Sequence, residues 1–175
     1  MAKFGQWAAS DLREGRGKPL ELYEITMKIL FVDAGNYSRS PAAEVIAKTH
    51  FARNSLSTPH VFSSAGLKDK HVGGGADPRT IEECAARGYD LSAFRCRQID
   101  GSDFREFDQI LAMDQSNLDA LREHCPPLQR SKLALFIPGG EVPDPYFGGA
   151  DGFKLTISLI EKRIGELVLE LGSGN

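Results

Sequence analysis

The sequence predicts an α/β fold: an open four-stranded parallel sheet with helices on both faces. Short apolar segments typical of buried strands recur along the chain, and segments with helical spacing lie between them. Capping residues mark where several of these helices begin. Strands that alternate with helices form parallel sheets covered on both sides. Ligands in such folds bind beyond the carboxyl ends of the strands, so we expect the functional site there.

The expected strands are the apolar segments 28–32, 60–64, 108–113 and 133–137. The first helix should begin with Pro41 at its N1 position and run to about Arg53. Asp77 and Asp114 are expected N-caps of the next two helices, which end near 88 and 124. A Gly/Pro-rich loop is expected over 138–152, followed by an amphipathic helix over 153–171. We expect one domain over 27–175, with 1–26 as an extension of unclear origin.

Composition excludes several classes of function. A formal net charge of −3 provides no basic surface for nucleic acid. No apolar segment is long enough to cross a bilayer, and the N-terminal segment lacks the apolar core of a secretory signal. The three cysteines are an odd number without CxxC spacing, which favours a reducing, cytoplasmic compartment. Because no large exposed apolar stripe is evident, we expect a monomer.

The segment from Asp33 to Pro41 is the strongest candidate for a functional site. It leaves the first strand and enters a helix, so its backbone N–H groups and the helix N-terminus can surround an oxyanion. Gly35 and Asn36 tolerate the left-handed backbone that such a loop requires. The guanidinium of Arg39 can bind two phosphate oxygens. The expected phosphate-binding residues are Ala34, Gly35, Asn36, Tyr37, Ser38 and Arg39.

With cysteine at position 33, this segment would resemble the C-x5-R-S signature of the low-molecular-weight protein tyrosine phosphatases. Four further segments resemble the same family in order: 63–66 (SSAG), 71–79 (HVGGGADPR), 111–114 (LAMD) and 144–149 (DPYFGG). The resemblance covers nearly all of 27–171. It implies the phosphotyrosine phosphatase I fold, a flavodoxin-like Rossmann architecture, and hydrolysis of phosphotyrosine through a cysteinyl-phosphate without a metal or other cofactor.

The resemblance also implies roles for individual residues. Position 33 would hold the nucleophile, Arg39 would bind the phosphoryl oxygens, and Asp144 would protonate the leaving oxygen and then activate water. Ser40 would stabilise the nucleophile, while Asn36 and Ser64 would hold the loop in shape. Tyr146 and His71 would line the substrate groove. The expected substrate is a phosphotyrosine protein or a small aryl phosphate.

Asp33 departs from the family at the nucleophile. Other phosphatases use a nucleophilic aspartate with Mg²⁺ and a second carboxylate two residues later, but Gly35 stands there, so no metal site is expected. We therefore expect an inactive or nearly inactive form in which Asp33 partly satisfies the loop itself. Inorganic phosphate or sulfate would bind only weakly.

The origin of Asp33 stays open. The otherwise intact set of site residues favours deliberate inactivation of a phosphatase, and the alternative is a natural pseudophosphatase that binds phospho-ligands or regulates. A slow Asp33 nucleophile is a third alternative. Arsenate reduction is disfavoured, because that reaction needs the loop cysteine and a resolving pair, for which Cys84 and Cys96 are far apart in the sequence.

Overall fold

A computed structural model describes residues 26–54 and 59–172 of the chain. The segment 1–25, most of the expected extension, lies outside the described residues. The division into an extension (1–26) and a domain (27–175) therefore stays a prediction. None of the described helices combines the length and the apolar character needed to span a membrane.

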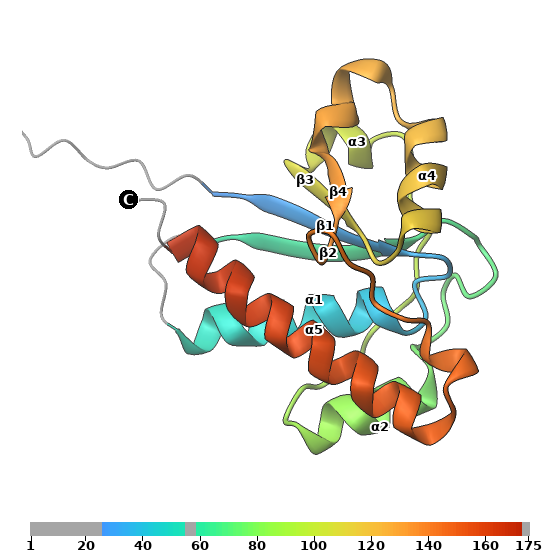
Figure 1. The fold of residues 1–175 in the computed structure, drawn as a ribbon, viewed down its shortest axis with the longest axis vertical. Coiled ribbons are helices and arrows are strands. Elements are labelled where there is room, and N and C mark those ends of the chain that lie inside the picture. Colours follow the sequence, from blue (N-terminus) through green and yellow to red (C-terminus); the bar gives the residue numbers. More distant parts are fainter. Residues whose placement is uncertain (1–25, 55–58, 173–175) are drawn as a thin grey trace, which may run out of the picture.

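A parallel sheet of four strands forms the centre of the molecule. Its strands are β1 (Lys28–Asp33), β2 (Val61–Gly66), β3 (Gln109–Ala112) and β4 (Leu133–Leu135), in the order β2-β1-β3-β4. All three pairings are parallel, which confirms the predicted fold class. β1 and β3 occupy the middle of the sheet, and the loops that follow their carboxyl ends meet at one edge (Figure 1).

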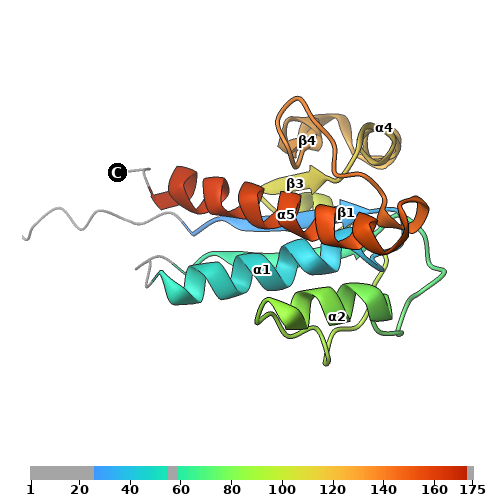
Figure 2. The same cartoon turned by 60° about the horizontal axis from the view of Figure 1, so that its bottom comes forward.

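The side chains of β1 alternate between the two faces of the sheet and are apolar on both. Helices therefore cover both faces, and each face has its own core. Ile29 and Phe31 pack into one core, formed with α1 (Arg39–Arg53), α2 (Pro78–Ala86) and α5 (Gly149–Gly172). Leu30 and Val32 pack into the other core, formed with α3 (Asp103–Glu106) and α4 (Gln115–His124). Figure 2 shows α1 and α2 on the opposite side of the sheet from α4. A strand buried on both faces is typical of parallel sheets.

The expected N-caps form as predicted. Asp77 accepts a hydrogen bond from the Arg79 backbone N–H (2.9 Å), and Asp114 accepts one from that of Asn117 (2.7 Å). Gly88 has a φ of 84°, the left-handed conformation that follows many helices. These signals are local in sequence, so tertiary packing does not alter them.

Several predicted boundaries are wrong. α1 begins at Arg39, two residues before Pro41; Pro41 still lies in the first turn, where a missing N–H costs nothing. β2 begins and ends later than the segment 60–64, and β4 has three residues. α5 begins at Gly149, within the expected loop. The sequence analysis also missed α3 and two 3-10 helices, η1 (Pro127–Lys132) and η2 (Pro145–Phe147).

Candidate active site

The loop from Asp33 to Ser40 connects the end of β1 to the start of α1, where the sequence predicted it. Asp33 is the last residue of β1 and pairs in register with Gly66 at the end of β2. A Cβ at position 66 would lie 2.5 Å from the Gly35 carbonyl carbon and 2.6 Å from the Asn36 nitrogen. Only glycine therefore allows the loop to pack this closely against β2.

The Asp33 carboxylate occupies the inside of the loop. Its Oδ1 accepts hydrogen bonds from the backbone N–H groups of Gly35 (3.1 Å) and Asn36, and its Oδ2 accepts one from that of Ser40 (2.9 Å). The side chain is buried, with 3% of its surface exposed. Three donors that surround the loop centre thus already bind an oxyanion, which is supplied by the chain itself.

Asn36 holds the loop in its conformation. Its φ is 54°, and it is the one described non-glycine residue with a positive φ. Its Nδ2 donates to the hydroxyls of Ser40 (3.0 Å) and Ser64 (2.9 Å), and its Oδ1 accepts from the backbone N–H of Arg97 (2.8 Å). These contacts offset the cost of a left-handed residue, and they involve three separate parts of the chain.

Arg39 is buried and held by two partners from the far side of the site. Its Nη1 donates to Asp114 Oδ2 (2.7 Å) and to the Val142 carbonyl (2.8 Å). Its Nη2 lies 3.8 Å from Oδ2 of Asp144. With only 4% of its side chain exposed, Arg39 is a fixed positive charge at the floor of the site. A positioned guanidinium of this kind is suited to binding phosphoryl oxygens.

Asp144 lies at the mouth of the site on the loop before α5. Its Oδ1 accepts a hydrogen bond from the Tyr146 backbone N–H (3.0 Å) and thereby caps η2. Its other oxygen faces Arg39, and 42% of the side chain is exposed. The carboxyl group is therefore accessible to a bound substrate while its backbone is fixed by the turn.

An open cavity of about 470 Å³ leads from solvent to Asp33 and Arg39. One wall is the Tyr37 ring, stacked on His71 with a centroid distance of 3.9 Å. Tyr146 (69% exposed) and Phe147 (85% exposed) also line the cavity. Lys68 and Lys70 also line the cavity. The size and the aromatic walls suit a ligand with one aromatic ring and an anionic end.

The structure brings all of the sequence-predicted site residues to this cavity or to the hydrogen bonds that support it. The loop residues Asp33, Ala34, Gly35, Tyr37, Ser38 and Arg39 line it, as do His71, Asp144 and Tyr146. Asn36 and Ser40 belong to the loop itself, and Asn36 donates hydrogen bonds to the hydroxyls of both Ser40 and Ser64, the latter in β2. Their individual catalytic roles stay predictions.

Sequence analysis missed three groups that hold this arrangement. Asp114 was expected only as a helix cap, yet its second carboxylate oxygen binds Arg39. Its position at the end of β3, next to β1, was a usable signal. Glu44 accepts a hydrogen bond from Ser64 Oγ (2.6 Å). It lies one helical turn after Ser40, and that spacing was the only local signal. Nothing local indicated that Val142 would offer its carbonyl.

The native thiols lie outside the loop. Burial raises the pKa of the Cys84 thiol to about 12, and burial also raises the pKa values of Cys96 and Cys125. The negative charge of Asp33 raises the pKa of Cys96 further. Only the thiolate is a good nucleophile, and the raised pKa values keep these three thiols protonated, so none of them is activated to attack a phosphate ester.

We expect the folded protein to resist alkylation by iodoacetamide at pH 8. With a pKa of about 12, only about one Cys84 thiol in 10,000 is ionised at that pH, and burial restricts access further. Mass spectrometry should find all three cysteines modified only after denaturation. A native thiol that reacts within minutes would contradict the structural account of these cysteines.

Among the described residues, no group of three or more His, Cys, Asp or Glu side chains is arranged to hold a metal ion. The carboxylates of the site bind backbone N–H groups and Arg39 instead. The chemistry available from these residues is therefore oxyanion binding by N–H groups and a guanidinium, next to an accessible carboxyl group.

Comparisons with known proteins agree with this geometry. Residues 28–174 match the family "Low molecular weight phosphotyrosine protein phosphatase". A Synechocystis sp. protein named for the same family is 40% identical over 153 residues, which cover 83% of this chain and 97% of the relative. The Schizosaccharomyces pombe low molecular weight phosphotyrosine protein phosphatase is 38% identical over 73% of this chain and 85% of its own length.

A crystal structure of a protein tyrosine phosphatase from Entamoeba histolytica superposes with a TM-score of 0.79. It is 37% identical, and the match covers 85% of this chain and 99% of that one. The sequence match, the parallel sheet and the loop around Asp33 and Arg39 all lead to one conclusion: the chain belongs to the low molecular weight phosphotyrosine protein phosphatase family.

Proposed function

We propose that this chain carries a phosphotyrosine-directed phosphatase site from which the nucleophile has been removed, with Asp33 at the position of the catalytic cysteine. The observation that carries the proposal is the binding of the Asp33 carboxylate by the N–H groups of Gly35, Asn36 and Ser40. These are donors suited to a phosphoryl oxyanion. The form with Asp33 therefore has the family's site but not its turnover.

The remaining residues fit the reaction in a form with a thiolate at position 33. The sulfur would attack phosphorus, forming a P–S bond as the P–O bond to the aryl group breaks. Arg39 and the loop N–H groups would stabilise the charge on the equatorial oxygens. Asp144 would donate its proton to the leaving phenolate and then accept one from the water that releases inorganic phosphate. The positions of Arg39 and Asp144 at one cavity support these roles.

Asp33 is poorly suited to replace the thiolate. Both of its oxygens accept hydrogen bonds, which lowers their nucleophilicity and holds them in the loop. An incoming phosphate also meets a like charge, and two unit charges 4 Å apart repel by about 4 kcal/mol at an effective dielectric constant of 20. The acyl-phosphate route is therefore disfavoured at the binding step as well as at the chemical step.

The cavity supports an aryl phosphate as the substrate class. The stacked rings of Tyr37 and His71 and the exposed rings of Tyr146 and Phe147 line the same opening that leads to Arg39. A phosphotyrosine ring could pass between these aromatic walls with its phosphate directed into the loop. Lys68 and Lys70 at the mouth suit peptides with acidic residues beside the phosphotyrosine.

The proposal is tested by removing the Asp33 carboxylate from the loop. We expect Asp33→Ala to bind inorganic phosphate at least about tenfold more tightly than the Asp33 chain, because it frees three N–H donors and removes a like charge. Calorimetry at pH 7 measures the change. The matched control is Asp119→Ala, which removes an exposed carboxylate on α4 and should leave phosphate affinity unchanged.

Two outcomes, one from the phosphate titration and one from calorimetry with a phosphotyrosine peptide, would contradict the proposal. Equal phosphate affinity in the Asp33 chain and Asp33→Ala would mean that Asp33 does not compete for the loop. Tight binding of a phosphotyrosine peptide by the Asp33 chain itself would favour the second candidate function, a phospho-ligand binding module, over an inactive phosphatase.

A further inference from the structure

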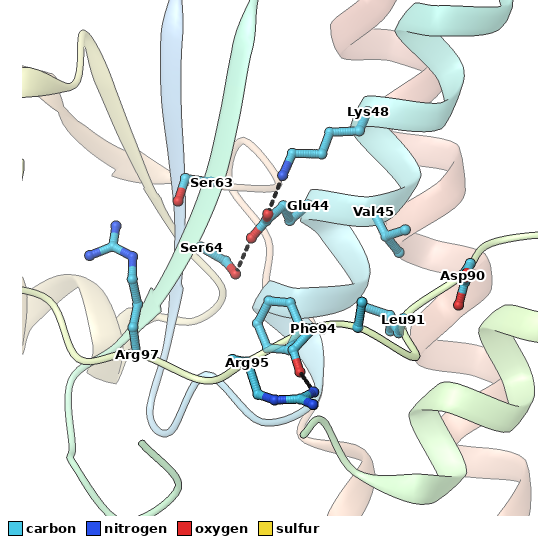
Figure 3. A pocket seen from close by; sticks show the side chains of 11 residues that line it. Glu44, Val45, Lys48, Ser63, Ser64, Asp90, Leu91, Phe94, Arg95 and Arg97 are labelled. Atoms are coloured by element: carbon cyan, nitrogen blue, oxygen red, sulfur yellow. Dashed lines mark hydrogen bonds and ion pairs between the residues drawn. The ribbon is translucent and has the colours of Figure 1, made fainter. Parts of the chain in front are cut away.

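A second cavity, separate from the catalytic mouth, lies behind the phosphate loop. It is open to solvent and has a volume of about 380 Å³ between α1, the end of β2 and the segment 90–97 (Figure 3). This volume falls within the range of small-molecule sites. The lining residues on which the argument depends are Glu44, Val45, Lys48, Leu91, Phe94 and Arg95.

This rear pocket combines an apolar wall with a charged rim. Val45, Leu91 and the half-buried ring of Phe94 form the apolar part, and the Phe94 ring projects toward Glu44 and Ser64 in Figure 3. The charged lining residues are Lys48, Arg95 and Arg97 against Glu44 and Asp90, and the charge of Arg97 is neutralised by Asp103, which lies outside the lining. An aromatic ring next to a guanidinium that has no carboxylate partner favours an aromatic anion.

Arg95 is the cation available to a ligand. Lys48 pairs with Glu44, and Arg97 makes a two-bond pair with Asp103 (3.0 Å for each bond). Arg95 donates only to the carbonyl of Phe94 and, within the described parts of the chain, pairs with no carboxylate. Its exposed guanidinium therefore retains donors for the anionic group of a ligand in the rear pocket.

The geometry points to a second binding site in the rear pocket for a small aromatic anion: one or two fused rings that carry a carboxylate or a phosphate. The ring system lies against Phe94 and Leu91, and the anionic group binds the guanidinium of Arg95. The volume of the pocket limits the ligand to this size. Binding there requires no catalysis at Asp33, so the site is independent of the proposed function.

Hydrogen bonds connect the rear pocket to the phosphate loop. Glu44, on the pocket wall, accepts from Ser64 Oγ (2.6 Å), and Ser64 accepts from Asn36 Nδ2 (2.9 Å). The backbone of Arg97, from the opposite wall, donates to Asn36 Oδ1 (2.8 Å). Asn36 is the left-handed residue of the loop. A ligand that fixes both walls therefore restricts the conformation of Asn36 and so changes the affinity of the loop for phosphate. By linkage, bound phosphate changes the affinity of the rear pocket for its ligand by the same factor.

Titration of the ¹⁵N-labelled full chain with 2-naphthoate tests this inference. We expect saturable shifts of the backbone amides of Val45, Leu91 and Arg95, together with shifts at Asn36. Neutral 2-naphthamide and non-aromatic cyclohexanecarboxylate should each bind about tenfold more weakly, because each lacks one of the two interactions.

Two charge-reversed variants locate the site. Arg95→Glu should lower the affinity for 2-naphthoate about tenfold or more. Arg122→Glu, which replaces an exposed arginine on α4, should leave that affinity unchanged. Shifts confined to the catalytic mouth at Tyr37 and His71, absence of saturation, or equal binding of the neutral amide would each overturn the inference. Pocket shifts without any change at Asn36 would overturn the connection to the loop.

Discussion

Asp33→Cys is expected to convert an inactive protein into a phosphatase, with turnover of p-nitrophenyl phosphate at least about 10³-fold above that of the Asp33 chain. The introduced sulfur would lie one bond closer to the backbone than the carboxylate oxygens do, leaving the N–H groups now used by Asp33 free for phosphate. The loop N–H groups and the N-terminus of α1 would lower the pKa of the new thiol and favour the thiolate.

The matched control is Asp33→Ser, which has a similar size but no thiolate. It should bind phosphate and remain without turnover, so a gain seen only with cysteine isolates the nucleophile. A folded Asp33→Cys protein that hydrolyses neither p-nitrophenyl phosphate nor a phosphotyrosine peptide would refute the proposed function. Turnover by the Asp33 chain at a rate similar to that of Asp33→Cys would refute the proposal that it is inactive.

Removal of Arg39 from the active Asp33→Cys protein is expected to cost at least about 10³-fold in kcat/KM. A single oxyanion-binding donor is worth about 10²–10³ in kcat, and an arginine placed on a transferring phosphoryl group is worth more. The buried guanidinium, fixed by Asp114 and Val142, has no neighbouring cation in the loop to replace it. Most of the loss should fall on kcat, because charge on the equatorial oxygens is stabilised in the transition state.

Two variants separate this catalytic effect from a loss of fold. Arg122→Ala removes an exposed arginine paired with Asp119 and should leave kcat/KM unchanged. Arg39→Lys retains a charge near Asp114 but loses the planar two-bond geometry, so we expect a folded protein whose kcat remains far below that of its parent. Thermal unfolding of each variant shows whether the fold is intact. A kcat/KM within tenfold of the parent after Arg39→Ala would contradict the role given to Arg39.

Local sequence signals determined the fold class and the place of the loop. The apolar segments of β1 and β3, the caps Asp77 and Asp114, and the turn residue Gly88 act through neighbouring backbone, so their effects appear in the sequence itself. The loop was also locatable, because a glycine, an asparagine and an arginine follow directly after a buried strand. Boundaries were less accurate, since packing decides where β4 and α5 begin or end.

Tertiary structure alone decided how the loop is occupied and supported. The sequence places aspartate at position 33, but only the folded loop brings the N–H groups of Gly35, Asn36 and Ser40 to its two oxygens. Likewise Arg39 meets Asp114, 75 residues away in the sequence, because adjacent parallel strands end at one edge of the sheet. Local backbone preferences act over a few residues and can be predicted from the sequence, whereas contacts between distant segments depend on the packing of the whole sheet.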